Sequence, residues 1–309
     1  MPCVAISQDS TNTSVFDRFT VDVVAGVTDS SIIHKPGEPS ENWSARHTTG
    51  KLDIKRVRES GFTAFLSMGL APKDPKTLEF WIHRNDFFKT FKYFGFSDSN
   101  DVFTGYDVTF GRMNVEMTEE TSTSVDSLLL VSRSGVADSL GIMDWQLKAS
   151  KSLGRLTLAT IVSLGIQEDG KAKEDSNSHR RTYGVAKYHL PSDIVARASI
   201  RIHTIDPWVY AAGISKKGRF AFEVLRFNDI VQKRNITQYY VLYRQPLSRG
   251  FEVLGRYENI IGPNKRTIGF GWGYKNHDLD IRVVTSVIDM TDGTRLLNSQ
   301  FLFHVPFFP

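Results

Sequence analysis

The chain has 309 residues, of which 40% are hydrophobic, 12% aromatic and 23% charged, a composition that excludes a disordered protein. Its formal charge of +4 comes from 38 Lys and Arg against 34 Asp and Glu spread along the sequence, which does not indicate a nucleic-acid-binding surface. The single cysteine, Cys3, excludes a disulfide framework or a cysteine-based zinc site within the chain. No apolar run reaches the ~18 residues of a membrane-spanning helix.

The first 50 residues differ from the rest in their pattern of apolar and polar residues. Residues 1–14 lack the basic and apolar regions of a secretory signal, so we expect no export through a bacterial secretion route. Apolar residues between Phe16 and Val27 fit both helical spacing and the alternation of a strand, and both alternatives stay open. We therefore predict an N-terminal segment over residues 1–50 and one main domain over residues 51–309.

Through the main domain, apolar and polar residues alternate, which places successive side chains on opposite faces of a strand. The sharpest case is Thr267–Tyr274, where Ile, Phe, Trp and Tyr alternate with Thr or Gly. Glycine at alternating positions of a strand relieves crowding on a curved inner face, whereas a phosphate-binding loop needs a turn that opens a helix. Short turns separate the alternating runs, which predicts antiparallel neighbours.

Units of about ten strand residues and a short turn divide residues 51–309 into roughly 19 strands. Open sheets rarely exceed about ten strands, and no propeller-length repeat is visible. We therefore predict an all-β fold, a large antiparallel transmembrane β-barrel with a short N-terminal segment. Two longer polar stretches, Thr118–Asp126 and Glu168–Arg181, are expected to be solvent-exposed loops.

A barrel of this size has a lumen too wide for side chains to fill, so its apolar stripes are expected to face lipid. The polar stripes carry mixed charges that suit a water-filled lumen, and the candidates for lumen-facing charges are Arg197, Arg201, Glu223, Glu252, Arg256, Glu258, Asp280 and Arg282. Aromatic residues on the apolar stripes are predicted to lie at the membrane interfaces, namely Trp208, Tyr210, Tyr239, Tyr243, Trp272 and Tyr274. The alternative is a soluble all-β binding protein that buries the same stripes between sheets.

Several hairpins resemble those of the eukaryotic mitochondrial porin superfamily, which covers voltage-dependent anion channels and the protein-import pore of the outer membrane. Within Tyr183–Asp193 the strand Gly184-Val185-Ala186-Lys187-Tyr188 turns at an Asp into the alternating Ile194–Ile202, and Ile268–Tyr274 with the strand after it is similar. The last strand, Phe301–Phe308, lacks the glycine of the family's sorting signal, and the Gly-Leu-Lys tripeptide of the anion channels is absent. The resemblance implies a divergent member in the outer membrane of a mitochondrion or related organelle, with Val15–Val27 in or near the lumen.

No pattern of catalytic residues stands out. The eight histidines lack metal-binding spacing, and neither a nucleophile elbow nor a P-loop occurs, so we expect no enzyme activity, no metal and no cofactor. We predict a channel for passive passage of ions, metabolites or polypeptides, with the lipid bilayer and other outer-membrane subunits as partners and without nucleic acid. The alternative membrane function is a scaffold or assembly subunit without a transport role.

Overall fold

The computed structural model describes residues 18–34, 36, 44–57, 61–69, 77–87, 105–122, 143–164, 181–202, 208–229, 234–261, 265–276 and 279–306. In these ranges the chain is almost entirely β-structure, with two single 3-10 turns, η2 (Pro191–Asp193) and η3 (Ser248–Gly250). No helix in the described ranges is long and apolar enough to cross a membrane.

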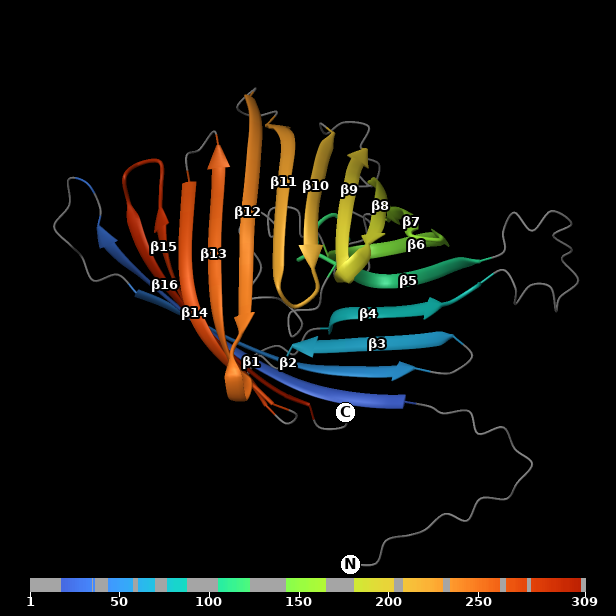
Figure 1. Cartoon of the computed structure of the whole chain (residues 1–309), viewed down its shortest axis with the longest axis horizontal. Helices are drawn as coiled ribbons and strands as arrows, with labels where there is room; N and C mark the ends of the chain where they lie inside the picture. Colours follow the sequence, from blue (N-terminus) through green and yellow to red (C-terminus); the bar gives the residue numbers. More distant parts are fainter. Residues whose placement is uncertain are drawn as a thin grey trace, which may run out of the picture.

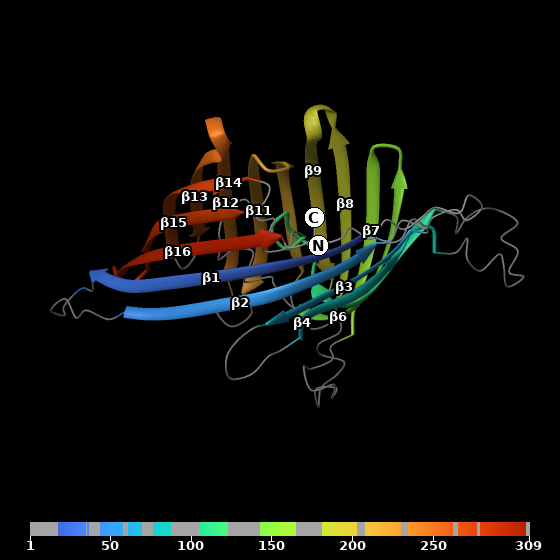
Figure 2. The same cartoon turned by 90° about the horizontal axis from the view of Figure 1, so that it is seen from below.

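The described ranges contain sixteen strands. They are β1 (Arg18–His34), β2 (Ser44–Val57), β3 (Phe62–Gly69), β4 (Thr77–Arg84), β5 (Tyr106–Asn114), β6 (Met143–Leu153), β7 (Leu156–Ser163), β8 (Thr182–Leu190), β9 (Ile194–Ile202), β10 (Val209–Lys216), β11 (Phe220–Asp229), β12 (Arg234–Pro246), β13 (Phe251–Ile261), β14 (Lys265–Lys275), β15 (Asp280–Asp289) and β16 (Arg295–Pro306). Consecutive strands lie side by side in chain order (Figure 1), and each pair is antiparallel. Because β1 pairs with both β2 and β16 (Figure 2), the sheet closes into a barrel.

Two details differ from the sequence-based prediction. The expected count of roughly 19 strands over residues 51–309 is not confirmed: in the described part of that range fourteen strands, β3 to β16, follow β2, and the eight residues 115–122 after β5 form no strand. The barrel also begins before residue 51: β1 starts at Arg18, and its pairing with β16 runs from Asp22 opposite Pro306 to His34 opposite Arg295. The part of Val15–Val27 that is described therefore belongs to the barrel wall, and residues 1–17 lie outside the described ranges.

The two faces of the wall have opposite character. In β14, Ile268, Phe270 and Trp272 are 41%, 72% and 52% exposed, whereas Thr267 and Gly273 on the other face are buried. Strand pairing carries this alternation from strand to strand, since residues opposite each other share a face. The apolar stripes thus face outward, as they do in a membrane barrel, while a soluble barrel would bury them.

The inner face is not uniformly polar. A cluster of buried apolar side chains lies on it, contributed by strands from β7 to β16 and by two residues that follow β5. Its members are Val115, Met117, Ile161, Tyr183, Val185, Val209, Ala211, Ala221, Leu225, Tyr240, Leu242, Leu254, Val284 and Leu302. Apolar packing therefore fills part of the barrel interior and adds to the stability that the strand pairing supplies.

Gly273 in β14 shows why the alternating run contains glycine. It lies on the inner face with Glu252 opposite it on β13 and Arg282 opposite it on β15. A Cβ at this position would lie 2.5 Å from the Glu252 Oε1 atom. Because glycine has no side chain, the two charged groups approach each other across β14, and Arg282 Nε lies 3.6 Å from Glu252 Oε1.

We predict that Gly273→Ala lowers the free energy of unfolding by about 1–3 kcal/mol, since overpacking displaces a buried charged group. Urea unfolding of the refolded protein in lipid vesicles measures this change. The control is Gly255→Ala on the outer face, where the nearest atom to the added Cβ is Tyr243 Cβ at 3.9 Å. Equal stability of the two variants would contradict the packing role of Gly273.

Candidate functional site

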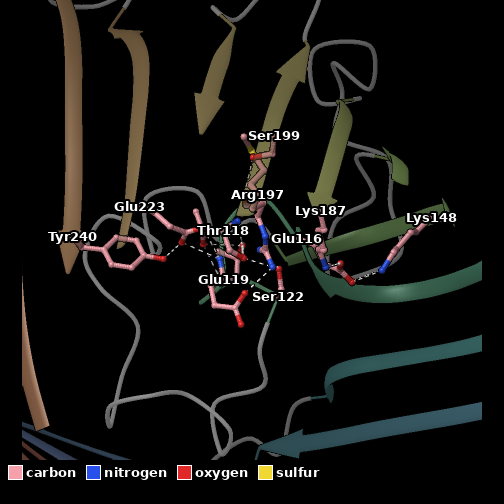
Figure 3. Close-up of polar contacts among 12 residues, drawn as sticks. Glu116, Thr118, Glu119, Ser122, Lys148, Lys187, Arg197, Ser199, Glu223 and Tyr240 are labelled. Atoms are coloured by element: carbon pink, nitrogen blue, oxygen red, sulfur yellow. Dashed lines mark hydrogen bonds and ion pairs between the residues drawn. The ribbon is translucent and has the colours of Figure 1, made fainter. Parts of the chain in front are cut away.

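The eight residues Val115–Ser122, called here the inserted segment, follow β5 directly and lie inside the barrel. Val115, Met117 and Thr118 are at most 1% exposed, and Figure 3 shows the segment between the inner faces of β6, β8, β9 and β11. The prediction of an exposed loop over Thr118–Asp126 is therefore wrong for its described part, Thr118–Ser122, because its polar groups find partners inside the barrel. Residues 123–126 lie outside the described ranges, as does all of Glu168–Arg181 except Arg181.

The segment makes its own turn. The Ser122 amide donates to the Thr118 carbonyl at 3.0 Å, and the Thr118 amide donates to Thr121 Oγ1 at 2.9 Å. Side-chain hydroxyls that bond to nearby backbone groups favour turns over strands. A further hydrogen bond, from Ser199 Oγ on β9 to the Met117 carbonyl at 2.7 Å, fastens the turn to the wall.

Glu116 holds the start of the segment to two lysines of the wall. Its carboxylate lies 2.5 Å from Lys148 Nζ on β6 and 3.2 Å from Lys187 Nζ on β8. Burial of Glu116 alone would raise its pKa, but the two lysine charges and their hydrogen bonds outweigh burial and lower the pKa from 4.5 to about 2. The carboxylate is therefore charged at neutral pH and clamps both lysines.

Glu119 and Ser122 hold the end of the segment to β9 and β11. The Glu119 carboxylate accepts a hydrogen bond from Arg197 Nη2 at 2.8 Å, and Arg197 also donates to Ser122 Oγ. The Glu119 backbone amide donates to both carboxylate oxygens of Glu223 at 2.9 Å, and the Tyr240 hydroxyl donates to the same carboxylate. The end of the segment is thus bound to Arg197 on β9 through its own side chains and to Glu223 on β11 through its own backbone amide (Figure 3).

A second inner-face glycine makes room for charged groups, here between β9 and β11. Gly213 on β10 lies between Arg197 on β9 and Glu223 on β11. A Cβ on Gly213 would lie 2.2 Å from Glu223 Cγ. The arrangement repeats that of Gly273, with an inner-face glycine flanked by a basic and an acidic residue.

A second network of charges lies on the inner face of β12 to β15. Glu252 is 2.5 Å from Arg244 Nη2, and the buried Arg282 makes a two-point contact with Asp280 at 2.5 and 2.9 Å. Arg256 and Glu258, two residues apart on β13, are 3.2 Å apart. Since removing one partner of a buried pair leaves an uncompensated charge, these residues stabilise one another only as a set.

All eight charged residues singled out from the sequence lie on the inner face. Seven are less than 9% exposed, and Arg201 is half-buried. The structure brings Glu252, Asp280 and Arg282 together in one network, Arg256 and Glu258 in another pair, and Arg197 and Glu223 at opposite sides of Glu119.

Sequence reasoning missed four groups that complete the site, namely Glu116, Glu119, Lys148 and Lys187. Lys148 and Lys187 occupy polar positions in strands whose apolar and polar residues alternate. This alternation could have identified them as inner-face residues. Glu116 and Glu119 carried no such signal, because nothing local tells a polar loop that folds inward from one that points to solvent. Within the described ranges, no three His, Cys, Asp or Glu side chains gather as metal ligands.

The six aromatic residues singled out from the sequence lie on the outer face. Trp208 and Tyr210 lie at the end of the barrel where β10 begins, Tyr239 lies near the middle of β12, and Tyr243, Trp272 and Tyr274 lie toward the opposite end, where β12 and β14 stop. Two aromatic levels on an apolar outer surface are typical of transmembrane barrels.

Comparison with solved structures agrees with this architecture. The chain is similar to the anion-selective porin from Comamonas acidovorans (10% identical, 94% of this chain and 100% of that chain covered, TM-score 0.61). It is also similar to OmpF of Salmonella typhi in complex with daunomycin (9%, 93% and 97%, TM-score 0.60) and to the outer membrane channel DcaP of Acinetobacter baumannii (9%, 94% and 97%, TM-score 0.63). No protein-family model and no curated protein matches the chain.

At this identity the likeness concerns the fold alone, and it is a likeness to bacterial outer-membrane porins. A β-barrel of the porin type is thereby supported. The finer resemblance to mitochondrial porins is not supported by these structures.

The position of the inserted segment should depend on pH. Because the pKa of Glu116 is lowered from 4.5 to about 2, its contribution to stability is complete above pH 4.5 and is lost as the pH falls toward 2. We expect oxidation of Met117, 1% exposed, by hydrogen peroxide to accelerate across this range, as measured by mass spectrometry.

Glu116→Gln removes the titrating group and leaves two half-buried lysines uncompensated, so Met117 should oxidise roughly tenfold faster already at neutral pH. Met290, 38% exposed, serves as the internal control and should oxidise at one rate throughout. Protection of Met117 at pH 2 equal to that at pH 7 would show that Glu116 does not hold the segment.

Proposed function

We propose that the protein is a channel of an outer membrane that lets small hydrophilic solutes pass passively. The observation that carries this proposal is the acidic inserted segment held inside a closed barrel against basic wall residues. A barrel with lipid-facing apolar stripes needs no inward-folded charged segment for its stability alone, whereas a channel uses charged groups inside to choose among solutes. The bacterial porins with the same fold support the proposal through their shape.

The charges inside the barrel set the expected selectivity. On the segment, Glu116 and Glu119 contact Lys148, Lys187 and Arg197 at 2.5 to 3.2 Å, so opposite charges are paired where the segment meets the wall. Most of the interior charges are paired, and paired charges attract a passing ion less than single ones. We therefore expect mild selectivity in place of strict exclusion of one sign.

The test is the conductance of the refolded, purified protein in planar lipid bilayers. Stepwise current increases at constant voltage support a channel, whereas membrane insertion without current steps contradicts it. Carbonate extraction of a native membrane fraction examines the placement in the bilayer independently, since an inserted barrel stays with the membrane and a soluble protein leaves it.

Placement in the mitochondrial outer membrane and passage of polypeptides stay predictions that rest on the hairpin resemblance. Fractionation of source cells into organelles tests the first. Block of the ion current by a presequence-like peptide, compared with a peptide of equal charge and scrambled order, tests the second.

We predict that Arg197→Glu combined with Arg201→Glu shifts the reversal potential toward cation preference. Each charge that acts on an ion at about 4 Å in water changes the permeability ratio on the order of fivefold. The matched control is Arg226→Glu with Arg266→Glu, which reverses the same number of charges on the exposed outer face. An equal shift in both variants would show that overall charge, not the interior, sets selectivity.

The buried apolar cluster favours a second candidate function, a barrel scaffold without a transport role. Leu225, Tyr240, Leu242 and Leu254 are 0% exposed, so apolar packing and the inserted segment together occupy part of the interior. A scaffold would show no current steps in wild type, and Glu116→Gln, which frees the segment, would not open it.

A further inference from the structure

One end of the barrel carries many exposed cations. The part of this end called here the short-turn rim is formed by the turns β6/β7, β8/β9, β10/β11, β12/β13 and β14/β15, several of which are seen at the lower strand ends in Figure 1. Its exposed basic residues are Arg155, Lys217, Arg219, Arg249 and Lys275. In the described residues of these turns the one exposed carboxylate is that of Asp193.

Most of these cations form no ion pair with a carboxylate of the described ranges. Lys275 lies 3.4 Å from the buried Asp280, but no ion pair joins Arg155, Lys217, Arg219 or Arg249 to a carboxylate of the described ranges. Each therefore adds to a positive potential at this rim, and like charges along one rim repel one another unless an anion lies between them.

The outer surface next to these cations is apolar. Leu153, Leu247 and Phe251 are 52%, 55% and 50% exposed, and each lies two residues from Arg155 or Arg249. At about 3.4 Å per residue the charged groups begin within roughly 7 Å of the last lipid-facing side chain. That distance corresponds to the level of the headgroup phosphates, which long basic side chains reach from an apolar surface.

We infer that the short-turn rim binds the headgroups of anionic phospholipids, so that this end of the barrel lies in a leaflet rich in negatively charged lipid. The inference rests on the membrane placement in the proposed function but not on conduction. Basic residues at the level of an anionic headgroup layer each add to the attraction, and the sum over several residues gives a preference for that lipid over a zwitterionic one.

The experiment uses Trp272 as a reporter near this rim, three residues before Lys275 on β14. A variant that keeps Trp272 and replaces the other four tryptophans by Phe is reconstituted into phosphatidylcholine vesicles with a fixed fraction of brominated lipid. Quenching by brominated phosphatidylglycerol is compared with quenching by brominated phosphatidylcholine. We expect an apparent preference for the anionic lipid of about fivefold, which falls at high salt.

Two matched double variants locate the effect. Arg219→Gln with Arg249→Gln removes two of the five rim cations and should lower the preference at Trp272 from about fivefold to roughly two- to threefold, while Arg226→Gln with Arg266→Gln, which removes two exposed arginines near the opposite end, should leave it unchanged. Heat-dependent gel mobility confirms that each variant is folded. Equal quenching by both lipids in the parent protein, or an equal loss in both double variants, would overturn the inference.

The outcome is separable from that of the proposed function. If neither brominated lipid quenches Trp272 or a matching Trp208-only variant, the outer face is not in lipid and both proposals fail. If both lipids quench equally, only the headgroup inference fails. Conductance of the same preparation reports on the channel alone.

Discussion

Closure of the sheet is the constraint on which the rest of the structure depends. A strand at a sheet edge leaves backbone amides and carbonyls without partners, and hydrocarbon offers none. The pairing of β1 with β16 over most of the length of both strands removes the two edges that a chain of sixteen antiparallel strands would otherwise expose. With every wall strand paired on both sides, the outer face can be apolar, and aromatic side chains can gather toward its two ends.

A closed wall creates an interior, and the interior must accommodate the polar half of every alternating strand. The protein does so in two ways. Charged residues form pairs and networks, as in the contacts of Arg282 with Asp280 and Glu252. Apolar residues such as Leu225 and Leu254 occupy other inner positions and pack into one cluster with Met117 of the inserted segment. The interior is thus a mixture of polar and apolar regions.

The inserted segment links these two regions. Its apolar residues join the buried cluster, while Glu116 and Glu119 reach basic residues on β6, β8 and β9. Gly213 makes one such contact possible, because it leaves space that the side chain of Glu223 fills, as Gly273 does for Glu252 elsewhere on the inner face. Charge compensation and local absence of side chains therefore work together in positioning the segment that gives the interior its polarity.

The sequence by itself determined the character of each strand. Alternation in stretches such as Thr267–Tyr274 predicted strands with one apolar and one polar face, and it assigned Arg197, Glu252 and Arg282 to the polar one, because side-chain direction in a strand follows from position alone. It also indicated a porin-like barrel, since so many antiparallel strands need closure.

Only the tertiary structure decided what depends on residues far apart in the chain. The entry of β1 into the wall rests on pairing with residues 261 to 284 positions away, from His34 with Arg295 to Asp22 with Pro306, which no local pattern reports. The inward path of Val115–Ser122 likewise rests on Lys187, Arg197 and Glu223, which become its neighbours only when the barrel closes. Local spacing fixes the direction of a side chain, whereas the partner that it meets is set by the register of distant strands.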